Sequence, residues 1–63
     1  MYFVINMDLD TVDFGHVKPG KIMDAVDFAK LVADCAPVES VAFPTWDLAA
    51  DYSEAVHPEF LTE

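Results

Sequence analysis

Acidic side chains are the residues of this sequence whose number and spacing could do chemistry. The chain has twelve Asp and Glu residues and three Lys, which gives a formal net charge of -9. Rows of carboxylates attract the Lys and Arg side chains of a basic partner, and a tight cluster of carboxylates can bind a cation. Three groups stand out, and we call them the N-terminal cluster (Asp8, Asp10 and Asp13), the first-helix row (Asp24, Asp27 and Asp34) and the second-helix row (Asp47, Asp51 and Glu54).

A calcium site is the alternative for the N-terminal cluster together with Asn6. A calcium loop of the EF-hand kind has a glycine at its sixth position and a bidentate Glu at its twelfth. Counted from Asp8, these positions hold Asp13 and Pro19, so the pattern does not match. We therefore expect an acidic rim at the end of a strand and no bound metal.

The histidines and the cysteine do not indicate an enzyme. His16 and His57 are far apart in the sequence, with no further His or Cys at ligand spacing, and no Ser, His and Asp arrangement suggests a nucleophile. Cys35 follows Asp34 at the predicted end of a helix, where the thiolate is disfavoured, so we expect it to pack as a small apolar residue. A lone cysteine also fits a reducing cytosol. The sequence predicts a non-enzymatic protein with no cofactor.

The composition predicts a single folded domain over residues 1–63. Apolar residues make up 54% and aromatic residues 13%, which is too hydrophobic for a disordered acidic tail. A chain of this length buries only about 60% of its unfolded surface, so self-association as a homodimer is an alternative. The negative charge repels nucleic acid and anionic membranes. A partner attracted at long range should be basic, because the summed field steers oppositely charged molecules. The N-terminal segment lacks the basic lead of a signal peptide, so we expect a cytoplasmic protein.

Two segments must position the N-terminal cluster. Alternation over residues 2–9 predicts a half-buried strand whose Phe3 and Ile5 meet a helix. Residues 12–17 also alternate, and they form either a second strand, in a hairpin that turns around residues 10–11, or an irregular loop. The residues that follow, Lys18-Pro19-Gly20-Lys21, have the chemistry of a tight turn.

Two predicted helices carry the other acidic residues. Residues 23–35 predict a mostly buried helix with Asp24 as N-cap and one narrow polar stripe, which contains the first-helix row. Thr45 is the expected N-cap of a second helix over residues 46–56. The apolar side of this second helix is expected to consist of Leu48, Tyr52, Ala55 and Val56, widened by Trp46 and Ala49.

Residues 38–43 predict a further strand that ends at Pro44. This strand would run parallel to the first one if a helix joins two direct neighbours, whereas a hairpin favours an antiparallel or mixed sheet. The expected fold is α+β, a small single domain with a two- to three-stranded, mainly antiparallel sheet packed by two helices, in the order β-(β)-α-β-α. Residues 59–63 are expected to form a short tail, in which Phe60 and Leu61 either clasp the core or make a dimer contact.

Trp46 and Tyr52 are the candidates for an aromatic anchor, because such rings dominate many binding interfaces. In so small a chain the core also needs them, and core packing is the interpretation that we favour. The net charge of -9 exceeds in magnitude the value of about 2 to 8 that solubility requires of a small domain. A compact domain of this length has a radius of gyration of roughly 11 Å and spans about 27 Å. B-DNA carries about sixteen phosphates over that length, a number comparable to the carboxylates here.

In its size, its lack of arginine, its lone cysteine and its carboxylate rows, such as Asp24, Asp27 and Asp47, Asp51, Glu54, the chain resembles a class of small acidic phage proteins. These proteins block CRISPR complexes or other defence enzymes by occupying a DNA-binding surface. The resemblance implies an anti-CRISPR-type inhibitor that mimics DNA in a bacterial cytoplasm. Its partner would be a basic nucleic-acid-binding protein, contacted where the target duplex or its recognition motif (PAM) enters.

We expect the contact residues to be acidic, with Trp46 as anchor. They are Asp24, Asp27, Asp47, Asp51 and Glu54, followed by Asp8, Asp10 and Asp13. The alternative function is a small acidic interaction module or a homodimeric accessory subunit, whose acidic face serves only solvation.

Overall fold

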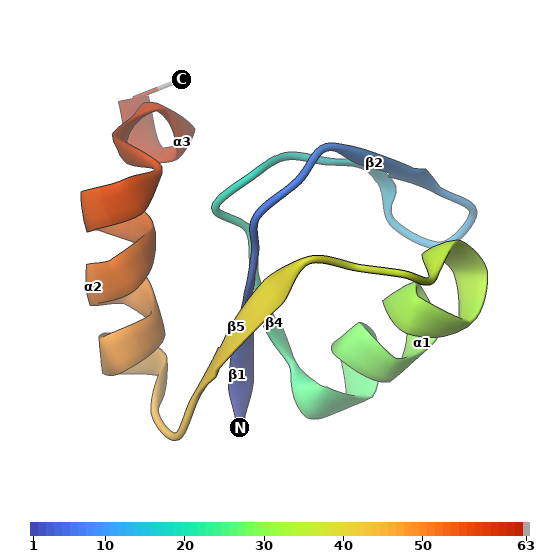
Figure 1. Ribbon diagram of the computed structural model, residues 1–63, viewed down its shortest axis with the longest axis horizontal. Helices are drawn as coiled ribbons and strands as arrows, with labels where there is room; N and C mark the ends of the chain where they lie inside the picture. Colours follow the sequence, from blue (N-terminus) through green and yellow to red (C-terminus); the bar gives the residue numbers. More distant parts are fainter. Residues whose placement is uncertain (63) are drawn as a thin grey trace.

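The computed structural model describes residues 1–62, with side chains to Phe60 (Figure 1). Three of its strands form a sheet in the order β4-β1-β5, and the other two form a separate hairpin, β2-β3. Both sheets are antiparallel, which confirms the predicted α+β fold. No described helix has the length and hydrophobicity to cross a membrane. The elements, in chain order, are β1 (Tyr2–Ile5), β2 (Leu9–Thr11), β3 (Gly15–Val17), β4 (Ile22–Asp24), α1 (Ala25–Cys35), β5 (Ser40–Phe43), α2 (Trp46–Val56) and α3 (Pro58–Thr62).

The central strand β1 has a helix on each of its two faces (Figure 1). On one face, the ring of Phe3 stacks on Phe28 of α1, with ring centroids 4.0 Å apart. Val4 points to the other face and is covered as well. Val4 and Ile5, on opposite faces of the strand, both have 0% exposure. Successive side chains of a strand point to opposite faces. The prediction of a half-buried strand was therefore wrong at Val4, because α2 covers the face that was expected to meet water.

The larger core lies between the central sheet, α1 and the hairpin. It is built on Ile5, Val17, Met23 and Leu31, and these are packed against half-buried residues that include Phe28. Leu31 is the buried residue of α1, whereas Val26 is 66% exposed. The expected mostly buried helix was thus wrong, because α1 packs on one side only. The strand β4 was also missed, since Met23 belongs to it and the helix begins at Ala25, with Asp24 as the predicted N-cap.

The hairpin β2-β3 confirms one of the two alternatives for this segment and shifts its turn. The turn falls after Thr11, whose Oγ1 accepts a hydrogen bond of 2.8 Å from the backbone N–H of Phe14. Gly15 follows with φ of 66°, a conformation that a residue without a Cβ adopts readily. The strand expected over residues 2–9 is interrupted after Ile5, so that its last part pairs within the hairpin instead.

The predicted turn at residues 18–21 brings β4 back to β1. The backbone N–H of Lys21 donates to the carbonyl of Lys18 (3.2 Å), and the N–H of Gly20 donates to the carbonyl of Ile5 (2.7 Å). Gly20 has φ of 105°, and a Cβ built on it would lie 2.8 Å from the Cβ of Phe60. A glycine is therefore required here both by the backbone conformation and by the close approach of α3.

Helix α2 begins after its predicted N-cap, Thr45, but buries a different side from the one expected. Its buried residues are Ala49 and Ser53, while Leu48 and Val56 are 47% and 50% exposed. Two small side chains let the helix backbone approach the sheet closely, so the large apolar residues lie outside the contact. The prediction of Leu48, Ala55 and Val56 as the packed side was wrong.

The segment expected to be a short tail is the helix α3. Its Phe60 is half-buried and lies over Gly20 and His57, so this residue clasps the structure as one alternative predicted. The side chain of Leu61 lies outside the described residues.

Candidate functional site

The three acidic groups do not share one surface. The first-helix and second-helix rows lie on opposite sides of the central sheet, because α1 and α2 cover its two faces (Figure 1). The N-terminal cluster lies between them: the carbonyl of Asp10 accepts a hydrogen bond of 3.4 Å from the Sγ of Cys35 at the end of α1, whereas Asp8 faces the end of α2. The radius of gyration is 10.8 Å and the longest dimension 27 Å, close to the expected size. One partner surface can therefore face either helical row, but not both.

The first-helix row is partly engaged within the protein. The Oδ1 of Asp24 accepts a hydrogen bond from the backbone N–H of Asp27 (2.8 Å), which caps α1. Asp27 is half-buried, and Asp34 is exposed. Lys30 lies three residues after Asp27 and four before Asp34, on the same face of the helix. The cation within this row reduces its pull on an external basic group.

The N-terminal cluster is exposed and includes an ion-pairing contact. The Nε2 of His16 lies 3.0 Å from the Oδ1 of Asp8, and both side chains are exposed. Asp10 lies opposite His16 in the hairpin register, and Asp13 is in the turn. An exposed pair of this kind contributes little to stability. The described part of the chain contains no group of three His, Cys, Asp or Glu side chains that could hold a metal ion.

The second-helix row differs from the other two acidic groups because no basic residue or histidine lies within it. Asp47, Asp51 and Glu54 are all exposed, and α2 contains no basic residue. Spacings of four and three residues place them on one face, separated by about 6 and 4.5 Å along the helix axis. No hydrogen bond or ion pair of these carboxylates is recorded among the described residues. This row is therefore available to external cations.

Trp46 lies beside this row and not in the core. Its side chain is 54% exposed at the start of α2, so the favoured core interpretation was wrong for this residue. Tyr52 behaves differently, because its ring is half-buried and lies 5.2 Å from that of Phe43. Trp46 lines an open groove between α2 and β4, together with Ile22 and Phe60. Trp46 is the first residue of α2, and the buried residues of the helix, Ala49 and Ser53, begin one turn later.

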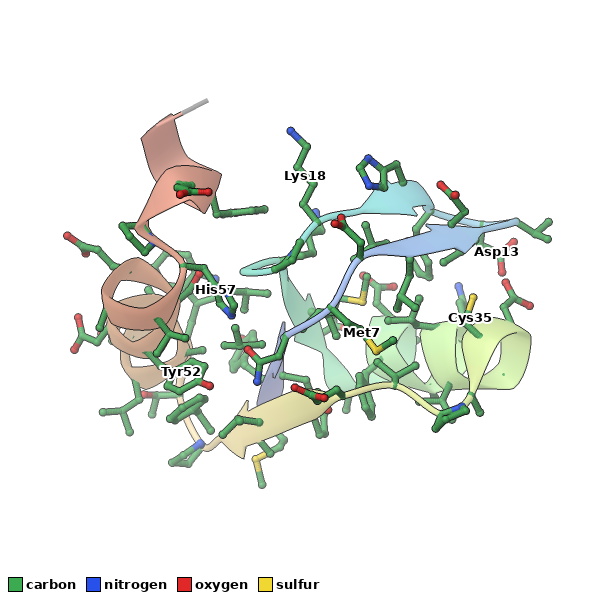
Figure 2. The ribbon with its side chains drawn as sticks, turned by 45° about the horizontal axis from the view of Figure 1, so that its top comes forward. Met7, Asp13, Lys18, Cys35, Tyr52 and His57 are labelled. Carbon is green, nitrogen blue, oxygen red and sulfur yellow. The ribbon has the colours of Figure 1, made fainter. Side chains whose placement is uncertain are left out.

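A cleft in the structure brings together the two histidines, which are far apart in the sequence. His16 and His57 line a cleft of about 450 Å³ between the hairpin and the end of α2, with Asp8, Lys18 and Glu59. Figure 2 shows Lys18 between the hairpin and α3. No sequence signal could have found this cleft, because it depends on how α3 folds back over the turn at residues 18–21.

The ring of His57 is already engaged in a half-buried hydrogen-bond network. Its Nε2 lies 2.7 Å from the Oδ1 of Asn6, and the Nδ2 of Asn6 donates to the Oη of Tyr52 at 3.2 Å. Tyr52 of α2 and His57, which follows the helix, both point toward the end of β1 (Figure 2). This network ties α2 to the central strand, so the role of His57 here is structural.

Comparison of the chain with known protein families, with curated proteins and with solved structures finds no significant match.

Proposed function

We propose that this protein is a non-enzymatic inhibitor that binds a basic, nucleic-acid-binding protein through the outer face of α2. The carboxylates of Asp47, Asp51 and Glu54 would pair with Lys and Arg side chains that otherwise hold DNA. Nucleic acid is then excluded by competition, as in the DNA mimics that the sequence resembles. A guide-loaded CRISPR effector is the example of such a partner, and a cytoplasmic location follows from it.

The observation that carries the proposal is the unneutralised second-helix row. A net charge of -9 steers a basic protein toward the molecule at long range. Of the three acidic groups, this row alone consists of exposed carboxylates without a cation, a histidine or a helix cap among its contacts in the described residues. The row is sparser than a DNA strand, which has one charge per roughly 3.4 Å. We therefore expect α2 to replace a few phosphates at the centre of a contact, not a whole duplex.

The test is competition with DNA. Fluorescent duplexes are bound to a panel of purified nucleic-acid-binding proteins that includes a guide-loaded CRISPR effector, and this protein is then titrated in. We expect displacement of the duplex from at least one member, with an affinity that falls as salt increases. Failure to displace DNA from every member at low salt would contradict the proposal.

Two triple variants with the same change in charge locate the contact. Asp47→Asn/Asp51→Asn/Glu54→Gln should weaken displacement about tenfold or more, because it removes the ion pairs that orient the complex. Asp10→Asn/Asp13→Asn/Asp34→Asn should have a much smaller effect. Both should leave the folded state intact, because substitutions at exposed positions usually change stability by no more than about 0.5 kcal/mol. Equal losses from both triples would contradict the assignment to α2.

A second candidate function is an interaction module or homodimer that uses apolar contacts. The exposed large apolar residues favour it, since Leu48 and Val56 on α2 and Val41 on β5 are 47%, 50% and 37% exposed. Such an interface would be tolerant of salt. Light scattering in high and low salt distinguishes the two candidates, because a salt-tolerant dimer supports the module and a monomer supports the inhibitor.

A further inference from the structure

The groove between α2 and β4 adds an apolar element beside the second-helix row. Its volume is about 440 Å³, and its lining includes Ile22, Trp46, Ala50 and Phe60. Sites that take small molecules have volumes of about 300–1,000 Å³, so the groove is large enough for one or two side chains.

The floor of the groove is buried and hydrogen-bonded, while one wall is exposed. Ser53 is only 2% exposed and donates a hydrogen bond of 2.7 Å from its Oγ to the carbonyl of Gly20. Phe60 is half-buried beside the same glycine. Trp46, in contrast, is 54% exposed. A buried floor below an exposed tryptophan is the arrangement expected of an anchor site, because large aromatic residues in well-packed pockets dominate binding energies.

The rim of the groove determines the chemistry of its occupant. Glu54 lines the groove and belongs to the second-helix row, whereas Lys21 lies on the other side. A second copy of this chain also carries a net charge of -9 and would be repelled. A segment with Lys or Arg beside its apolar residue would instead be attracted by the row while its apolar side chain enters the groove.

We propose that the groove binds an apolar side chain from a Lys/Arg-rich segment of a partner protein. The cations of that segment pair with Glu54 and the rest of the second-helix row. This inference rests on the proposed function, because it specifies which basic surface α2 recognises: one that has an exposed apolar residue among its cations. The ion pairs then set the rate and orientation of binding, and the apolar side chain provides specificity.

Two synthetic peptides test the inference, namely Lys-Arg-Lys-Phe-Lys-Arg-Lys and its counterpart with Gly in place of Phe. Trp46 is the single tryptophan of the chain, so its fluorescence reports occupation of the groove directly. We expect the Phe peptide to bind roughly tenfold more tightly or better and to change the Trp46 emission, because a phenyl group leaves water on binding. The Gly peptide should bind weakly, in a salt-dependent manner, without changing the emission.

Variants of two exposed residues of α2 provide the matched controls, with binding measured by the anisotropy of labelled peptides. Trp46→Ala should abolish the preference for the Phe peptide and keep the salt-dependent binding of the Gly peptide. Leu48→Ala removes a side chain that is 47% exposed and does not line the groove, so the preference should persist.

The outcomes separate this inference from the proposed function. Equal, salt-dependent binding of both peptides would overturn the apolar anchor and leave the basic partner supported. Absence of binding by both peptides at low salt would contradict the anchor and the proposed function together. Trp46 emission that changes with protein concentration alone, without peptide, would show that a second copy fills the groove and would also overturn the inference.

Discussion

The two faces of the central sheet differ in what holds a helix against them. On the face toward α1, apolar side chains from four elements form one cluster, and Leu31 enters it with 0% exposure. On the face toward α2, the buried residues of the helix are the small Ala49 and Ser53. Hydrogen bonds supplement them: Ser53 donates to the carbonyl of Gly20, the Nδ2 of Asn6 donates to the hydroxyl of Tyr52, and the Oδ1 of Asn6 accepts from the ring of His57.

This difference leaves the outer side chains of α2 with little part in packing. Although Tyr52 is half-buried against Phe43, most of the larger side chains of the helix remain exposed, because its buried residues are the small Ala49 and Ser53. Trp46 and the second-helix row are among them. On the α1 side, the large apolar residues are needed for folding, since a domain of this size has little core to spare. We therefore expect substitutions on the α1 side to act on stability and substitutions on the outer face of α2 to act on binding.

The largest effect on stability is expected when a buried side chain of the apolar cluster is truncated. Leu31→Ala should reduce the free energy of unfolding by about 2–5 kcal/mol, because it removes buried methyl groups and leaves a cavity. The whole domain is expected to have about 3–9 kcal/mol of stability, so this variant should be partly unfolded at 25 °C. Urea denaturation followed by circular dichroism measures the loss.

The control for this prediction lies on the same helix. Val26→Ala changes a side chain that is 66% exposed and should alter stability by no more than about 0.5 kcal/mol. If the two α1 variants were equally stable, the apolar face would not be the dominant one, and the comparison would fail.

A smaller effect is expected where a buried hydrogen bond is cut on the α2 side. Ser53→Ala should cost about 1–3 kcal/mol, because the carbonyl of the buried Gly20 loses the donor that satisfies it. Thermal unfolding of the variant against wild type would measure the cost. Ala55→Ser, which adds a hydroxyl at an exposed position of the same helix, should be close to neutral. A stability for Ser53→Ala equal to that of wild type would mean that packing alone holds α2.

The smallest effect is expected in the half-buried network. Tyr52→Phe should cost about 0.5–1.5 kcal/mol, since the Nδ2 of Asn6 then loses its acceptor while its Oδ1 keeps its contact with His57. Tyr2→Phe is the matched control, because no hydrogen bond of the Tyr2 hydroxyl is recorded among the described residues. Chemical denaturation should show a lower free energy of unfolding for Tyr52→Phe than for Tyr2→Phe. Equal values would mean that the network does not help to hold α2 on the sheet.

Local patterns in the sequence predicted much of the fold. Asp24 and Thr45 were recognised as N-caps because a short polar side chain before an apolar run satisfies the first free N–H groups of a helix. The turn at Lys18–Lys21 followed from the stereochemistry of Pro and Gly. These features involve residues close in sequence, so a single chain contains the information needed.

Features that depend on distant contacts could not be predicted in this way. Val4 is buried because a helix that starts more than forty residues later covers it, and period-two alternation cannot indicate that. Trp46 is exposed although it shares a helical face with Ala49 and Ser53, because it stands one turn before them at the start of α2. For the candidate site, the acidic residues were evident from the sequence. Their division between two sides of the sheet, and the groove beside one of them, required the three-dimensional structure.

The position of Gly20 makes it a natural reporter of cooperative opening. Its amide donates to β1, its carbonyl accepts from α2, and α3 lies over its α-carbon. The chain has two glycines, so selective isotope labelling of glycine would yield just two amide signals, and Gly15 would report on the hairpin. Deuterium exchange at Gly20 would then follow the simultaneous release of three elements, whereas exchange at Gly15 would follow fraying of the hairpin.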